Sequence, residues 1–471
     1  MLFPTLGFLL FFLVVAAVMA ALGTRFAAKK TVLVVASYYF YAQWDWRFCF
    51  LLAGSSALSY LAGLLIDRAS DERRARVILG IAVALHLGVL GTFKYFDFFV
   101  SSANQLARFL GLEHELPFVE ILLPVGISFF TFHGISYITD VYRGDVAVCR
   151  NPLDMLLYMS FFPQLVAGPI VRAAYFLPQL ARPSAEPIAV GPALLLILSG
   201  LFKKVVIANY VATGLVDPVF SAPTSYGGPD LLLATYGYAV QIFCDFSAYS
   251  DMAIALASLL GFRFPANFNQ PYRAQRLREF WQRWHISLST WLRDYLYKPL
   301  GGNRRGRLNT YRNLLLTMLL GGLWHGANWT FVAWGGLHGL YLAAERVLRA
   351  RFANYRPGPL MFVALGLITY TLVNITWVFF RAKTFGKAWV VLRGMFGQSG
   401  AVKPILDTFS LVTVAVIVGG MVVTHWLMRG RTLESVIART PAALVSVMWA
   451  LLAFAIVIAQ GAGSAFIYFQ F

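Results

Sequence analysis

The sequence has little charge for its length. Only 13% of its 471 residues are Asp, Glu, Lys or Arg, and 59% are hydrophobic, whereas a soluble domain carries about 25% charged residues. So few polar side chains cannot cover soluble domains. The same shortage excludes disordered and coiled-coil chains, which need polar or charge-rich sequence. The composition therefore predicts a polytopic membrane protein.

Among the charged residues, acidic ones are the fewer. The chain has 21 Asp and Glu against 39 Lys and Arg, a formal net charge of +18. In a soluble protein such a balance would suggest nucleic-acid binding. In a membrane protein, cytoplasmic loops carry excess Lys and Arg for reasons of topology. We therefore expect no nucleic-acid partner.

Signatures of metal and hydrolase chemistry are also missing. The three cysteines form no CxxC pair and are odd in number, which argues against a disulfide framework or a zinc site. No HExxH, GxSxG or Walker A pattern occurs. We expect neither a metal site nor a tightly bound cofactor.

Long apolar runs are what the sequence does contain. About 20 residues are needed to cross about 30 Å of hydrocarbon. Runs of this kind occupy residues 2–22, 46–66, 77–100, 117–139, 188–212, 231–261, 311–345, 359–381, 407–428 and 441–459. Shorter runs at 31–43 and 153–170 fit either a short span or a re-entrant segment, which needs protein or water around its backbone.

The distribution of Lys and Arg predicts the orientation. No basic residue precedes Arg25, so the first apolar run lacks the basic start of a cleaved signal peptide and should remain as a helix. Basic residues cluster before the 31–43 run and after the 46–66 run, whereas the turn between them has only Arg47. If 31–43 crosses, the N-terminus lies outside the cytoplasm.

One basic segment interrupts the apolar pattern. Residues 263–312 contain eleven Lys and Arg but only Glu279 and Asp294 as acids, a balance of +9. Its prolines and the Gly-Gly-Asn turn at 301–303 predict loops and short amphipathic helices, which we place on the cytoplasmic face. The charge fits positive-inside topology with attraction to anionic lipids. It equally fits a docking surface for an anionic cytosolic substrate, because phosphates need several Arg donors.

Two of the seven histidines have unusual surroundings. His285 lies inside the basic segment, and His325 lies early in the 311–345 apolar run. An ionisable residue within a membrane is a functional hypothesis by default. Burial keeps an imidazole neutral, which is the state that a general base needs. A hydrogen-bonded packing role for His325 is equally open, and for His338 packing is favoured.

Neighbours of His325 bear on the same hypothesis. Asn328, three residues further on, is expected to share its helical face and to orient the ring or bind a developing oxyanion. The spacings Gly322-xxx-Gly326 and Gly335-xxx-Gly339 are typical of helices that approach closely.

Acidic residues within an apolar run raise a different possibility. Asp245 and Asp251 could serve a proton relay or a pore, as in a transporter. On a helix they diverge by about 120°, so they do not form one paired-carboxylate site. We expect each to satisfy an Arg or a backbone end in the basic segment, and Lys203 and Lys204 to snorkel to an interface.

At these residues the sequence closely resembles the membrane-bound O-acyltransferases, in particular the bacterial branch that includes the alginate O-acetylation membrane subunit. Two long blocks carry the resemblance, residues 245–272 and 280–339, which include RWHIS around His285 and LWHG around His325. Three shorter motifs are also similar, DVYRGD at 140–145, AGPIVR at 167–172 and FIYFQF at 466–471.

The resemblance implies one all-α membrane domain over residues 1–471, with about eleven spans, re-entrant segments and an active site in a tunnel. It implies His325 as the catalytic residue and His285 as a second functional residue. It also implies a cytosolic thioester donor, acetyl-CoA, whose phosphates the basic segment would hold. Candidates for that contact are Arg293, Lys298, Arg304 and Arg305.

The activity expected from the resemblance is O-acetylation of a secreted polysaccharide, with alginate, cellulose and peptidoglycan all open. It would occur at the bacterial inner membrane, among its lipids, with the N-terminus periplasmic and an SGNH-type periplasmic transferase as partner. Two alternatives stay open. One is D-alanyl transfer from a carrier-protein thioester to teichoic acid. The other is a transporter or lipid-scrambling pore that uses Asp245 and Asp251.

Overall fold

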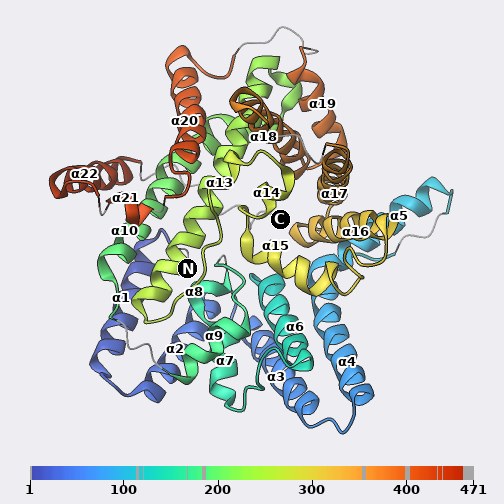
Figure 1. Cartoon of the computed structure of the whole chain (residues 1–471), viewed down its shortest axis with the longest axis vertical. Helices are drawn as coiled ribbons and strands as arrows, with labels where there is room; N and C mark the ends of the chain where they lie inside the picture. Colours follow the sequence, from blue (N-terminus) through green and yellow to red (C-terminus); the bar gives the residue numbers. More distant parts are fainter. Residues whose placement is uncertain are drawn as a thin grey trace. The chain divides into compact units, whose positions relative to one another are not determined.

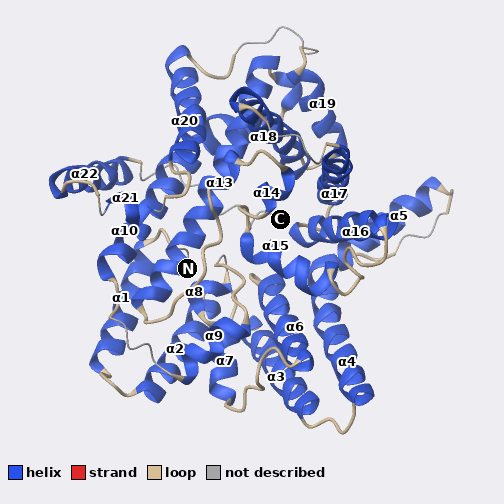
Figure 2. Cartoon of the chain, viewed as in Figure 1, coloured by secondary structure: helices blue, strands red, loops and turns tan. Residues whose placement is uncertain are grey.

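The structure is a computed structural model of the chain. It describes residues 3–112, 116–119, 121–166, 168–182, 187–352, 357–397, 404–431, 433–437 and 439–459. Helices and connecting turns make up this described part, with no strand in it (Figure 2). The all-α prediction is confirmed there, whereas the FIYFQF motif at 466–471 lies outside it. Backbone contacts group the chain into two compact units, so the single-domain description stays a prediction.

The first unit comprises residues 1–190 and 256–265. Its helices are α1 (Leu6–Ala21), α2 (Phe26–Ala42), α3 (Phe48–Asp67), α4 (Glu72–Leu90), η1 (Gly91–Tyr95), α5 (Phe96–Phe109), α6 (Ile127–Arg143), α7 (Pro152–Ser160), α8 (Phe162–Leu165) and α9 (Ala173–Ala181). Helices α3, α4 and α6 pack on one another, and α7 packs on α2, α3 and α9 (Figure 1). Asp71 starts α4 by accepting the Arg74 backbone N–H, a usual N-cap.

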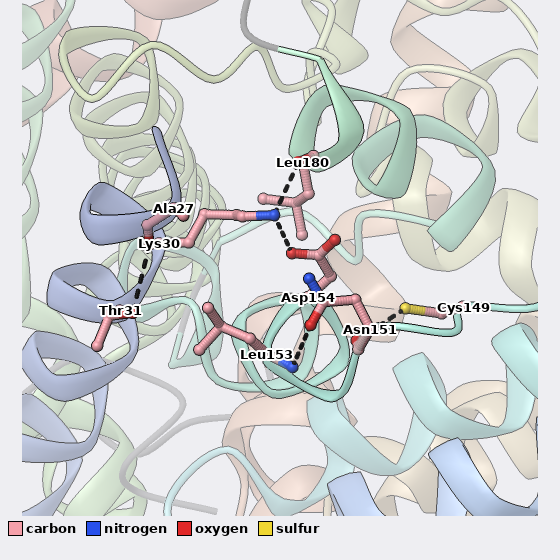
Figure 3. A network of polar contacts seen from close by, with 8 residues as sticks. All are labelled: Ala27, Lys30, Thr31, Cys149, Asn151, Leu153, Asp154 and Leu180. Carbon is pink, nitrogen blue, oxygen red and sulfur yellow. Dashed lines mark hydrogen bonds and ion pairs between the residues drawn. The ribbon is translucent and has the colours of Figure 1, made fainter. Parts of the chain in front are cut away.

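A buried ion pair joins three helices of this unit (Figure 3). The Lys30 Nζ of α2 lies 2.5 Å from Asp154 Oδ1 of α7 and 3.3 Å from the Leu180 carbonyl oxygen of α9. Lys30 therefore binds both a carboxylate and one of the carbonyls that the end of α9 leaves without helical partners. Burial makes this lysine depend on both acceptors, because an unpaired charge away from water is costly.

Replacing Lys30 with Met would leave the Asp154 carboxylate without its cation. We expect the free energy of unfolding to fall by about 3 kcal/mol, the usual cost of breaking a buried pair on one side. Denaturant unfolding of the purified protein measures this. Lys29→Met is the matched control, because Lys29 forms no ion pair within the described residues. A double variant, Lys30→Met with Asp154→Leu, should recover most of the loss, and equal instability of the single and double variants would contradict the prediction.

The second unit comprises residues 191–255 and 266–471. The chain enters it along α10 (Val190–Leu201) and leaves it for ten residues at the end of α13. Its further helices are η2 (Phe202–Ala208), α11 (Asn209–Val211), η3 (Ala212–Val216), α12 (Asp217–Ser221), η4 (Pro223–Ser225), α13 (Gly228–Leu259), η5 (Pro271–Arg273), α14 (Leu277–Trp281), α15 (Ile286–Leu292), η6 (Arg293–Tyr297), α16 (Arg307–His325), α17 (Trp329–Arg351), α18 (Pro359–Arg381), α19 (Phe385–Met395), α20 (Thr408–Leu427), α21 (Leu433–Ile437) and α22 (Ala442–Ile458).

Helices α16 and α17 form a tight hairpin, and glycines make it possible. A Cβ atom on Gly322 would lie 2.2 Å from the Phe331 carbonyl oxygen, and one on Gly335 would lie 2.1 Å from the Met318 carbonyl oxygen. Only residues without a side chain allow backbones to approach so closely. The predicted close approach is therefore confirmed at Gly322 and Gly335, whereas Gly326 lies beyond the end of α16.

Six helical segments of the described residues are long and apolar enough to cross a membrane. They are residues 48–67, 72–109, 190–221, 228–259, 359–381 and 408–427, and each contains or closely matches a predicted run. Helices α1 and α22 are apolar but shorter. A polytopic membrane fold is thus confirmed, while the number of about eleven spans stays a prediction.

Three predicted runs take a different form. The run at 311–345 is not one helix, because the chain breaks after His325 and starts α17 at Trp329. In the 117–139 run the helix begins only at Ile127. The ambiguous run at 153–170 forms the two short helices α7 and α8, which meet at Phe161. The basic segment does consist of loops and short helices up to the start of α16, as predicted.

Candidate active site

His325 ends α16, at the turn of the glycine hairpin. Three aromatic rings surround its imidazole: those of Trp324, Trp334 and Phe380 have centroids 4.9, 5.0 and 5.1 Å away. The residue is 4% exposed. Rings that meet edge-to-face hold the imidazole in one orientation, so the hairpin fixes both the position and the tilt of His325.

His285 is the second predicted histidine, and its backbone is unusual. It precedes α15 with a φ of 42°, in the left-handed region that a non-glycine residue adopts at a cost of order 1 kcal/mol. The residue is 0% exposed, and its ring packs edge-to-face on Phe246 at 4.6 Å. Burial lowers the pKa of His285 to about 3, so the imidazole is neutral at any physiological pH.

Asn267 holds the ring of His285 in place. Its Oδ1 accepts hydrogen bonds from the Ser287 backbone N–H at 3.2 Å and from Ser287 Oγ at 2.9 Å. Its Nδ2 donates to Ser250 Oγ at 3.0 Å. Because Oδ1 is thus an acceptor, His285 Nδ1, 3.3 Å away, must be the donor. The proton therefore sits on Nδ1, and the lone pair sits on Nε2.

The Nε2 atom of His285 is buried and has no hydrogen-bond partner among the described residues. A neutral imidazole with a free Nε2 lone pair can take a proton from a hydroxyl group. Trp324 connects this ring to the second histidine, because its indole lies 6.1 Å from the His285 ring and 4.9 Å from the His325 ring. The structure thus brings the two predicted histidines around one tryptophan.

Asn328 does not share a helical face with His325, and that prediction is wrong. Because α16 ends at His325, Asn328 becomes the N-cap of α17, where its Oδ1 accepts the Thr330 backbone N–H at 2.9 Å. Its Nδ2 donates to the Lys383 carbonyl oxygen at 3.1 Å. Both ends of the amide are engaged, so these contacts describe a helix cap. An oxyanion role stays a prediction.

The four predicted phosphate-binding residues follow α15. Arg293 and Lys298 share the carboxylate of Asp294, at 2.9 and 2.7 Å. Arg304 and Arg305 are exposed beyond the Gly-Gly turn and form no ion pair in the described part of the chain. The sequence therefore places four basic groups within one stretch, of which two already have a counter-ion.

Lysines of η2 are the ion-pair partners of the two acids on α13. Lys204 Nζ lies 2.8 Å from Asp245 Oδ1, and both side chains are at most 3% exposed. Lys203 Nζ lies 2.5 Å from Asp251 Oδ2. The prediction that these lysines snorkel to an interface is wrong, because their ammonium groups turn to α13. Each acid is paired with a lysine, so neither is a free charge of the kind that a pore or proton relay would use.

Similarity to known proteins identifies the class of enzyme to which the chain belongs. Residues 148–394 match the MBOAT, membrane-bound O-acyltransferase family. The probable alginate O-acetylase AlgI of Pseudomonas aeruginosa is 46% identical over 379 residues, which are 79% of this chain and 70% of that protein. The peptidoglycan O-acetyltransferase of Helicobacter pylori is 38% identical over 79% of this chain and 74% of its own length.

The chain belongs to the membrane-bound O-acyltransferase family. Within it, the chain falls in the branch of the alginate O-acetylases, and it is a multi-pass membrane acyltransferase. A more distant relative, the teichoic acid D-alanyltransferase of Bacillus subtilis, is 28% identical over 55% of this chain and 69% of its own length. The predicted family and enzyme class are confirmed.

Sequence reasoning did not single out Asn267 or the aromatic rings around His325. The sequence gives no signal for Asn267, because its burial between Pro265 and Pro271, which makes it need hydrogen-bond partners, is visible only in the structure. No spacing rule links position 267 with 285, since the pairing depends on the loop closing on itself.

Asn267→Ala would remove the acceptor of the Nδ1 proton and let the His285 tautomer change. We expect acyl transfer to fall at every pH. Asn267→Asp keeps an acceptor but adds a negative charge, which raises the pKa of His285. Its activity should therefore approach wild type at high pH and fall as the pH drops through the raised pKa. A pH profile of kcat/KM measures both effects.

The exposed Asn269 provides the matched control, and Asn269→Ala should keep the wild-type profile. The same profile for Asn267→Asp and Asn267→Ala would show that Asn267 only supports the fold.

Proposed function

We propose that this protein moves an acetyl group from cytosolic acetyl-CoA for O-acetylation of a secreted polysaccharide. Two of its relatives are named for O-acetylation, one of alginate and one of peptidoglycan. The observation that carries the proposal is the meeting of His285 and His325 at Trp324. Acyl transfer needs a neutral base beside the reacting groups, and these are two buried imidazoles around one ring.

The chemistry follows from the two histidines. A neutral imidazole takes the proton of the acceptor hydroxyl as its oxygen attacks the thioester carbonyl. The tetrahedral intermediate then collapses, the carbon–sulfur bond breaks, and the thiolate receives that proton. His325 is the proposed base, and its aromatic surroundings exclude water, which would otherwise hydrolyse the thioester. His285 is the proposed second polar group, with its lone pair already at Nε2.

The basic segment supports a cytoplasmic entry for the donor. Arg304 and Arg305 are exposed and without ion pairs in the described part of the chain, so they are available to phosphates. Arg293 and Lys298 would join them by exchanging part of their contact with Asp294. We place this face in the cytoplasm of a bacterium, the protein in its inner membrane and the N-terminus in the periplasm.

Delivery of the acetyl group to the polysaccharide requires a second protein. A polysaccharide outside the cell cannot enter a site that is buried within helices, so we propose that an SGNH-type periplasmic transferase receives the acetyl group and passes it on. D-alanyl transfer from a carrier-protein thioester is the second candidate, supported by the weaker similarity to teichoic acid D-alanyltransferases. The two candidates differ in their donor.

Purified protein, incubated with radiolabelled acetyl-CoA and a candidate acceptor, tests the proposal. We expect label transfer, and His325→Gln should lower its rate by about 10²-fold or more, the usual share of a general base. His338→Gln is the matched control. His338 is equally buried in the same hairpin, but its Nε2 already binds Thr376 Oγ1 at 2.9 Å, so most activity should remain.

A parallel reaction with a D-alanyl carrier protein separates the donors. Transfer from that carrier alone would contradict the acetyl proposal. Undiminished transfer by a folded His325→Gln variant would remove His325 from the mechanism.

A further inference from the structure

Arg273 is a buried residue whose cation forms no ion pair of its own within the described part of the chain. It ends η5 with 7% of its surface exposed, and its Nε is buried without a hydrogen-bond partner. Its side chain forms no ion pair or hydrogen bond with any described residue. A buried guanidinium nitrogen without a partner is costly, and a ligand or a second charge at this position would complete the site.

Two further arginines are brought to Arg273 by hydrogen bonds between their segments. The Asn269 backbone N–H donates to the Arg283 carbonyl oxygen at 2.9 Å, and Arg283 Nη1 donates back to the Asn269 carbonyl oxygen at 3.4 Å. Gln270 Nε2 donates to the Arg431 carbonyl oxygen at 3.2 Å. These bonds hold the residues after α14 against the residues just before η5. They also hold the segment after α20 against those same residues.

Arg429 belongs to that last segment. Helix α20 packs against η5, and the Arg429 guanidinium lies 4.9 Å from the centre of the Phe362 ring. In the preceding turn, His425 stacks on Tyr272, the neighbour of Arg273, at 5.7 Å. The ring contacts hold the segment in place, and the charge of Arg429 is near enough to that of Arg273 to repel it.

The three arginines carry more charge than their surroundings balance. Glu279 is the acid beside them, and it is already paired with Arg283 at 2.9 Å. Three cations and one carboxylate leave a charge of +2. Burial, and then the guanidinium groups of Arg283 and Arg429, lower the pKa of Arg273, yet a guanidinium keeps its proton in proteins. The site therefore lacks about two negative charges.

We propose that Arg273, Arg283 and Arg429 form a binding site for a phosphate group. A phosphate monoester carries both missing charges, a phosphodiester carries one of them, and the oxygens of either match the planar donors of arginine in pairs. The phosphate belongs either to the acyl donor, in which case the inference rests on the proposed function, or to an anionic phospholipid headgroup. This site is separate from the predicted residues 293–305, where Asp294 already pairs with two of the cations.

Binding to the purified full-length protein tests the site with two probes, coenzyme A and phosphatidylglycerol. Coenzyme A is titrated by calorimetry in a neutral detergent, and phosphatidylglycerol is added to phosphatidylcholine nanodiscs and detected by native mass spectrometry. Arg273→Gln should weaken binding of one of the two probes by about tenfold or more, because it removes charge-assisted hydrogen bonds to the phosphate. Arg276→Gln is the matched control, since Arg276 is exposed three residues away.

Each outcome decides a point. Weaker coenzyme A binding assigns the site to the donor, and weaker phosphatidylglycerol binding alone assigns it to a lipid. Unchanged binding of both probes by Arg273→Gln would overturn the site. If Arg273→Gln does not fold, the exposed Arg429 provides a second variant, Arg429→Gln, with the same expectation. Failure of the proposed function is separate, because it shows as absent acetyl transfer by wild-type protein that still binds phosphatidylglycerol.

A stability measurement supplies an independent readout. Without ligand, Arg273→Met should melt at a higher temperature than wild type, because it removes an uncompensated buried charge. With the bound probe present, wild type should gain more stability than the variant, since only wild type gains the linkage stabilisation of a ligand at this site. A variant that melts lower than wild type without any probe would contradict the account.

Discussion

The structure depends on one constraint, that polar groups in an apolar interior must find partners within the protein. Lys30 forms an ion pair with Asp154, and Lys204 forms one with Asp245. Each pair joins helices that are distant in sequence and thereby fixes how they pack. Buried pairs add little net stability, but they select one arrangement of helices that would otherwise present similar apolar faces to one another.

Several buried polar atoms of the second unit do not meet this constraint among the described residues, and His285 Nε2 and Arg273 Nε are two of them in the segment from Asn267 to His285. The His285 Nε2 lacks a partner, although Nδ1 of the same ring is held by Asn267. Arg273 lacks one although it is buried. Buried groups left unsatisfied are candidate positions for substrates and ligands.

Hydropathy predicted much of the fold, because a helix such as α18 is specified by its own residues. It failed where tertiary contacts decide. The run at 311–345 is apolar throughout, yet Gly326 and the N-cap Asn328 break it, and the closely packed glycines fold it into a hairpin. That break moved Asn328 off the helical face of His325 and made it the N-cap of α17.

For the site, chemistry and resemblance identified the two histidines. An imidazole in an apolar or basic stretch is noticeable because placing it there costs free energy. The partners of those histidines were not predictable. Asn267 is one of several asparagines near prolines, and only the folded loop brings it to His285. Arg273 is one of eleven basic residues in its segment, and sequence does not reveal which of them is buried or lacks a counter-ion.

The segment between Asn267 and His285 both carries Arg273 and orients His285, because its two ends are hydrogen-bonded to each other. The reciprocal backbone and side-chain bonds between Asn269 and Arg283 tie its two ends together. The left-handed backbone of His285 is maintained by this closure, since the Ile286 N–H donates to the Asn267 carbonyl oxygen at 2.9 Å. A ligand at Arg273 would therefore stiffen the same loop that fixes the His285 tautomer. Charge recognition and the orientation of His285 are, in this arrangement, properties of one loop.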